Sequence, residues 1–131
     1  MVVLIKTSVL VHCNNAPKMA RVIDLSIAIG HKDKACIQTH VRDDFVLKMI
    51  GTNDAFDLMH LDEVSVRMPD ILEMNITNAL SHGNAAMCEG IVTLKDKSVY
   101  SFCFVVKFVN TAKHALIKSG QIYIIKKTIK Y

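Results

Sequence analysis

The 131-residue sequence is poor in the residue patterns that mark special folds and sites. It has no tryptophan and only two prolines, and its five glycines are scattered along the chain. Scattered glycines exclude the phosphate-binding loops that need several glycines close together. No apolar run reaches the ~18 residues that a membrane-spanning helix requires. We therefore expect neither a nucleotide loop nor a membrane partner.

Cysteine pairs are also absent. The four cysteines are Cys13, Cys36, Cys88 and Cys103. None belongs to a CxxC pair, the spacing that structural zinc sites use. Cysteines far apart in a chain that can build its own core are typical of buried, reduced thiols. The apolar start "MVVLIKTSVLVHC" is interrupted by Lys6, so we interpret it as a strand and not as a signal peptide. These features predict an intracellular protein, cytoplasmic or nuclear, and not a secreted one.

No catalytic or metal-binding signature stands out. There is no GxSxG motif for a nucleophilic serine. Cys36 and His40 would share one side of a strand, but positions four apart on a strand are separated by ~13 Å, too far for one zinc ion. Asp57, His60 and Asp62 could converge only in a loop, where a solvated acidic loop is the simpler interpretation. The sequence therefore predicts a protein that is not an enzyme. We expect no catalytic residue, no metal site and no cofactor.

What the sequence does contain is a two-residue alternation of apolar side chains. In "VYSFCFVVKFV" one face of an extended chain holds Tyr100, Phe102, Phe104, Val106 and Phe108. Similar segments lie between turn signals rich in Gly, Pro, Asn and Asp. The predicted strands are 2–12, 21–29, 34–41, 44–50, 63–68, 71–77, 86–95, 98–109 and 121–130. They predict a single β domain over residues 1–131, all-β, an antiparallel β-sandwich or barrel of jelly-roll type with about eight or nine strands.

Helical signals are few. Residues 110–120 contain Thr111 as an N-cap and Gly120 as a stop, which predicts one or two turns. Residues 53–61 are predicted to be another single turn or a loop. The ending "QIYIIKKTIKY" alternates apolar and polar residues, so we expect a terminal strand. A basic arm for nucleic acid and a membrane-surface segment are the alternatives.

Charge is divided unevenly along the chain. Residues 43–73 hold eight acidic and two basic residues, whereas residues 97–131 hold seven lysines and no acid. The two regions can neutralise each other or remain solvated within one molecule, can guide the assembly of separate copies, or can leave a basic surface for phosphates. The sequence leaves these three explanations open.

These observations predict a non-enzymatic structural or adaptor protein that assembles with itself, as a homo-oligomer, or with a larger protein assembly. A small viral structural or accessory protein fits this outline. The alternative is a sequence-tolerant nucleic-acid-binding β-barrel that uses the C-terminal lysines, and an enzyme or ligand-binding barrel built from scattered polar residues is a third hypothesis. The candidate interaction or phosphate-binding residues are Lys113, Lys118, Lys126, Lys127 and Lys130. The candidate acidic partner surface consists of Asp54, Asp57, Asp62 and Glu63.

Overall fold

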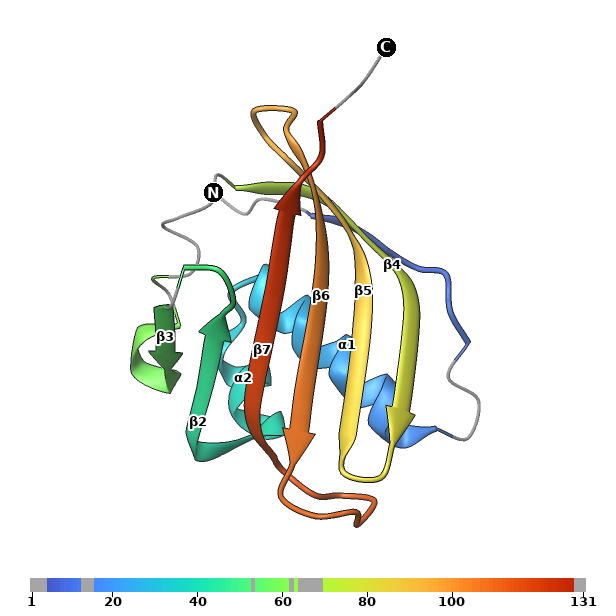
Figure 1. Ribbon diagram of the computed structural model, residues 1–131, viewed down its shortest axis with the longest axis vertical. Coiled ribbons are helices and arrows are strands. Elements are labelled where there is room, and N and C mark those ends of the chain that lie inside the picture. The colour runs from blue at the N-terminus through green and yellow to red at the C-terminus, as the bar shows by residue number, and fades with distance from the viewer. Residues whose placement is uncertain (1–4, 13–15, 53, 62, 64–69, 129–131) are drawn as a thin grey trace.

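The protein is an α+β domain in which two helices cover one face of a single curved sheet (Figure 1). The computed structural model describes residues 5–12, 16–52, 54–61, 63 and 70–128. In chain order the elements are β1 (Lys6–Val9), α1 (Pro17–Gly30), α2 (Lys34–His40), β2 (Val41–Met49), β3 (Asp54–Asp57), the 3-10 turn η1 (Leu58–His60), β4 (Ile71–His82), β5 (Ala85–Leu94), β6 (Val99–Phe108) and β7 (Ile117–Lys126).

The predicted β-sandwich or barrel is wrong. The described strands form one seven-stranded sheet in the order β1-β4-β5-β6-β7-β2-β3. The sheet is mixed, because β1 pairs with β4 and β2 pairs with β7 in parallel, while the other neighbours are antiparallel. Its inner face packs on α1 rather than on a second sheet (Figure 1). One sheet and a helical layer therefore replace the two sheets that an all-β prediction requires.

The error arises in residues 21–40, which were predicted to form two strands and instead form helices. Pro17 occupies the first turn of α1, where its missing N–H costs no hydrogen bond. Val22, Leu25 and Ala28 recur at helical spacing and are all buried. For α2, the Asp33 side chain accepts a hydrogen bond from the Cys36 backbone N–H at 3.1 Å, which caps the helix. Because six of the eight residues 22–29 are apolar, a two-residue alternation could be found in a segment that is helical.

The opposite error occurs near the C-terminus. Residues 110–120 were predicted to be helical, but β7 starts at Ile117 and Gly120 lies within it. Of residues 53–61, predicted to be a single turn or a loop, Asp54–Asp57 form strand β3 and only Leu58–His60 form a turn, η1. Strand predictions for 71–77, 86–95, 98–109 and 121–130 are confirmed by β4, β5, β6 and β7, as far as the described residues reach. Most of the predicted strand 63–68 lies outside the described residues.

The core lies between α1 and the inner face of the sheet. Phe102, Phe104, Val106 and Phe108 of β6 all point inward and are buried, as the alternation predicted. Phe45 of β2 and Val22 and Leu25 of α1 are also completely buried in this cluster. Burial of each such side chain stabilises the fold by about 1.5–3 kcal/mol. The core therefore fixes α1 across β4, β5 and β6 and leaves the other sheet face outward.

Basic side chains fasten α1 to the β6–β7 connection. Lys18 Nζ donates to the carbonyl oxygens of Thr111 and Ala112, at 2.8 and 3.2 Å. The Arg21 guanidinium donates to the carbonyls of Ala115 and His40 and lies 5.3 Å from the centre of the Phe108 ring. Lys18 and Arg21 therefore hold α1 against the β6–β7 connection and are not available to a ligand.

Gly90 gives the clearest test of the sheet's geometry. A Cβ on this residue would lie 2.0 Å from the Asn75 carbonyl oxygen, at the place where the β4–β5 register shifts between Ile76 and Asn78. We expect Gly90→Ala to destabilise the protein by about 3 kcal/mol or more, because backbone must move to admit the methyl group. The measurement is the free energy of unfolding in urea.

Gly30→Ala is the matched control. Its Cβ would lie 3.2 Å from the sulfur of Met74, the movable end of a flexible side chain, so the free energy of unfolding should change by less than about 1 kcal/mol. Equal stability of the Gly90→Ala variant and the wild type would contradict the close approach of β4 and β5.

Candidate functional site

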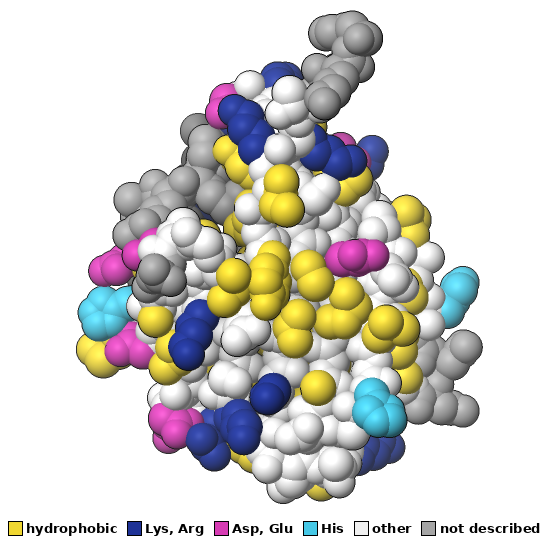
Figure 2. Space-filling view, in the orientation of Figure 1, with side chains coloured by type: hydrophobic (Ala, Val, Ile, Leu, Met, Phe, Trp, Pro, Cys, Tyr) yellow, Lys and Arg dark blue, Asp and Glu magenta, His cyan; other side chains and the backbone are white. Residues whose placement is uncertain are grey.

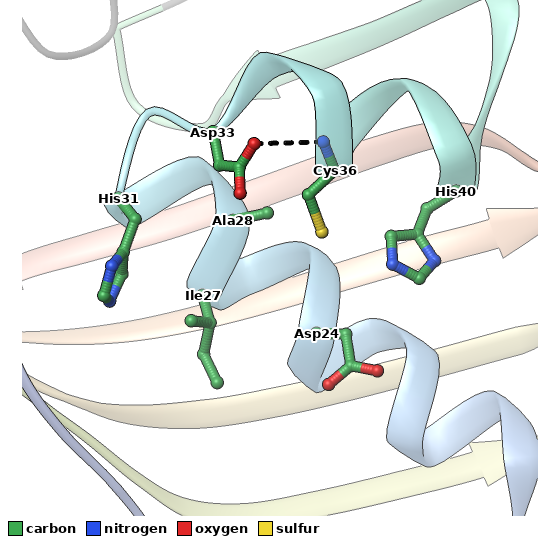
Figure 3. Close-up of a pocket in the computed structure, with 7 residues that line it drawn as sticks. All are labelled: Asp24, Ile27, Ala28, His31, Asp33, Cys36 and His40. Carbon is green, nitrogen blue, oxygen red and sulfur yellow. Dashed lines mark hydrogen bonds between the residues drawn. The ribbon is translucent and has the colours of Figure 1, made fainter.

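A small open pocket of about 250 Å³ lies where α1 meets α2 (Figure 3). Its lining residues are Asp24, Ile27, Ala28, His31, Asp33, Cys36 and His40. Ile27 and Ala28 form an apolar floor, while the remaining side chains are polar or titratable. The pocket brings together two histidines, two aspartates and a cysteine from α1, α2 and the segment between them.

The pocket exists because residues 34–40 are helical. A strand over residues 34–41 would separate Cys36 from His40 by ~13 Å, and this prediction is wrong. On α2 these residues are one turn apart, and both side chains point from α2 toward α1, where Asp24 lies (Figure 3). A helical interpretation of "KACIQTH" would have placed them together.

The electrostatics of the pocket do not favour a Cys–His nucleophile. Burial, together with the charges of Asp33 and Asp24, raises the pKa of the Cys36 thiol. Burial and the positive charge of Arg21 lower the pKa of His40, against a smaller opposing effect of Asp24. At neutral pH the pair is therefore a thiol and a neutral imidazole, whereas a reactive cysteine needs its thiolate.

The other polar groups of the pocket are engaged elsewhere or exposed. His31 Nε2 lies 3.0 Å from Thr7 Oγ1 of β1, and the Asp33 carboxylate caps α2. Within the part of the chain that the structure describes, no three His, Cys, Asp or Glu side chains are arranged to hold a metal ion. Nor is either described helix long and apolar enough to cross a membrane.

The second candidate site is the outer face of the sheet, on the side opposite the helices. The strand registers align side chains of this face in rows that cross the strands. The apolar members of the outer face are Val46, Leu80, Met87, Ile91, Val99, Cys103, Val105, Tyr123 and Ile125. Figure 2 shows a band of hydrophobic side chains across the middle of this face, with lysines and arginines gathered beyond it.

Exposure on the outer face is high for apolar residues. Ile125 is 70% exposed, Leu80 60% and Tyr123 40%. None of these apolar residues was predicted to belong to a site. A signal was present, because Val99, Cys103 and Val105 make the second face of β6 apolar as well, and strands that are apolar on both faces are usually covered on both.

The predicted lysine site does not form one surface. Lys113 lies in the β6–β7 connection and Lys118 near the start of β7, while Lys126 and Lys127 lie at its other end. Eight residues of strand separate Lys118 from Lys126, about 26 Å. Lys130 lies outside the described residues.

The predicted acidic surface is only partly described. Asp54 and Asp57 lie at the two ends of the short edge strand β3, Glu63 is exposed, and Asp62 lies outside the described residues. The Asp57 carboxylate is 2.6 Å from His60 Nδ1, and this hydrogen bond lowers the pKa of Asp57 and raises that of His60. The acidic side chain is therefore paired locally on the surface.

Comparison with known proteins identifies the fold. No family model and no curated protein matches the sequence. Solved structures do match. A candidate ketosteroid isomerase of Kribbella flavida aligns with a TM-score of 0.70 at 12% identity, over 88% of this chain and 82% of that one. An NTF-2 like protein of unknown function from Burkholderia xenovorans aligns with a TM-score of 0.70 at 11% identity, over 92% and 91% of the two chains.

A candidate SnoaL-like polyketide cyclase of Shewanella denitrificans has a TM-score of 0.67 at 9% identity, over 85% and 92% of the two chains. The chain thus has the α+β NTF2-like fold, which includes both enzymes and proteins of unknown function. The expectation of a viral structural protein is wrong: it depended on the β-sandwich outline, and these structures support neither. Identities this low establish the fold alone.

Cys36 provides a test of the pocket's electrostatics. Asp33→Asn removes a negative charge beside the thiol yet keeps a side-chain oxygen that can cap α2. The thiol pKa should fall, so alkylation of Cys36 by iodoacetamide at pH 8 should become faster by about twofold or more. Peptide mass spectrometry measures the rate at each cysteine.

Two other thiols serve as controls in the same sample. Cys103 lies on the sheet and should react at its wild-type rate. Cys88 is buried, its pKa raised to about 12 by that burial, and it should stay unmodified until the protein unfolds. An unchanged Cys36 rate in the Asp33→Asn variant would contradict this account of the pocket.

Proposed function

We propose that the protein is a non-enzymatic assembly module that associates with a second copy of itself through the outer face of the sheet. The observation that carries this proposal is the contiguous apolar surface across β4, β5, β6 and β7. Monomeric soluble proteins rarely expose large continuous apolar patches, which usually mark interaction sites. A second copy offers the same apolar face and would cover it.

The residue types on the outer face are those of a protein interface. Tyr123 and Met87 lie near its middle, and both residue types are enriched in interface centres. Lys48 and Lys107 lie around the apolar band, where charged residues can remain hydrated. An apolar centre with a charged rim is the usual anatomy of a protein interface.

An enzymatic role inside the fold has less support. The neighbours named as an isomerase and a cyclase suggest this alternative. However, the buried interior of the described residues is apolar, apart from Ser26. Among the described residues no Asp, Glu, His, Lys or Arg is buried, so none of them is enclosed in that interior to transfer a proton.

A nucleic-acid role also has less support. The C-terminal lysines lie at opposite ends of β7, so they do not line one groove along which a phosphate backbone could run. Lys18 and Arg21, which could have extended such a surface, donate to backbone carbonyls instead.

Tyr123→Asp combined with Ile125→Asp tests the proposal. Both side chains are well exposed, so the fold should survive, but two carboxylates would have to be buried in the interface. We expect the wild type to sediment as a dimer and the variant to bind itself at least about 100-fold more weakly. Sedimentation equilibrium over a range of concentrations gives the dissociation constants, and circular dichroism reports the fold.

Met59→Asp is the matched control. Met59 is 82% exposed in η1, outside the outer face, so this variant should dimerise like the wild type. A wild type that remains monomeric at high concentration would refute the proposal, as would a Tyr123→Asp/Ile125→Asp variant that dimerises normally.

A further inference from the structure

Charged residues of opposite sign lie on the two sides of the outer face, and their positions favour one orientation of two copies. The strand registers give a central row of Leu80, Met87, Val105, Gln121 and Lys48, which crosses from β4 to β2. On one side of it lies the Glu89 row, made of Asn78, Glu89, Cys103 and Tyr123. On the other side lies the Lys107 row, made of His82, Ala85, Lys107, Ser119 and Val46.

Glu89 and Lys107 are the charged members of these two flanking rows, and they have opposite sign. Glu89 accepts a hydrogen bond from Asn78 Nδ2 at 3.4 Å. Within the described part of the chain, no ion pair involves Glu89 or Lys107. Each side of the central row therefore offers a charge that the described residues leave without an ion-pair partner.

Symmetry turns this arrangement into a prediction of orientation. When two sheets stack face to face with two-fold symmetry, the axis lies in the plane between the two faces. Residues on one side of the axis then lie opposite the residues that are on the other side of the axis in the second copy. With the axis along the central row, Glu89 on β5 lies over the second copy's Ala85. Lys107 is the cross-strand partner of Ala85, about 5 Å away on the same face, within reach of the carboxylate.

The alternative axis, along β6, is electrostatically poorer. It would place Lys107 over Lys107 and Glu89 over Tyr123, because rows are then preserved and strands exchanged. Like charges placed directly opposite each other disfavour association. With the axis along the central row, the two Lys48 side chains approach each other only at the β2 end, two strands from Val105, where they can remain hydrated.

We propose that a reciprocal pair of Glu89–Lys107 ion pairs between two copies fixes the orientation of the dimer, with the two-fold axis along the central row. The inference rests on the proposed self-association through the outer face. It specifies which orientation of the two copies the protein uses. It also names the residues whose like charges disfavour the alternative orientation.

Charge reversal with mixing tests the inference. In a dimer of the Glu89→Lys variant, each new lysine faces Lys107 of the other copy. In a dimer of the Lys107→Glu variant, each new glutamate faces Glu89 of the other copy. Both variants therefore have two repulsive contacts and should dimerise about tenfold more weakly or worse. An equimolar mixture of the two variants forms one native and one reversed ion pair, so it should regain nearly wild-type affinity. The double variant Glu89→Lys/Lys107→Glu should regain it without mixing. Sedimentation equilibrium at low salt measures all four samples.

Lys48→Glu is the control for charge alone. It makes the same kind of change on the same face, but in this orientation residue 48 lies opposite residue 48 of the second copy, so one like-charge contact replaces another and the variant alone should dimerise like the wild type. If each single variant dimerises like the wild type, or if the mixture stays as weak as its components, the ion-pair orientation is refuted. In that case the Tyr123→Asp/Ile125→Asp result still decides self-association separately, because a monomeric wild type would refute both proposals.

Discussion

The structure depends on the packing of α1 against the inner face of the sheet. Val22 and Leu25 are completely buried there, among the aromatic side chains of β2 and β6. Glycine lets the sheet fit this layer: at Gly120 a Cβ would lie 2.9 Å from the Phe104 ring, so any side chain would push the core apart. Lys18 and Arg21 then bind the β6–β7 connection to the same helix. A helix able to cover one face makes a second sheet unnecessary.

That arrangement leaves the other sheet face without a covering layer among the described residues. A single layer of helices can cover only one side, so the apolar residues of β4 to β7 that alternate with the core remain outward. The same NTF2-like architecture occurs in proteins named as isomerases and cyclases. Function must therefore be argued from the residues of a site and not from the fold. In this chain the buried side chains of the described residues are apolar apart from Ser26, and the charged side chains lie at the surface.

Part of the fold could be predicted from the sequence. The alternation in "VYSFCFVVKFV" correctly identified β6 and its inward face, because a strand between two other strands imposes a strict period of two. Residues 21–40 were misassigned because an apolar segment such as "VIDLSIAI" satisfies both a two-residue and a helical pattern. That error also concealed the pocket, since Cys36 and His40 become neighbours only when one helical turn separates them. The outer face was missed because the positions of strands in the sequence do not show which strands are neighbours. Without the pairing and register of the strands, the side chains that line up across the sheet cannot be identified.

By itself, the sequence determined the local properties: which segments alternate, where turns interrupt them, how acidic and basic residues divide along the chain, and that cysteines are not paired by spacing. Only the tertiary structure decided which elements share a layer, which strands are neighbours, and hence that Glu89 and Lys107 flank one apolar row. The physical reason is range. Periodicity and turn chemistry act over a few residues, whereas register and coverage depend on contacts between segments that are distant in the chain.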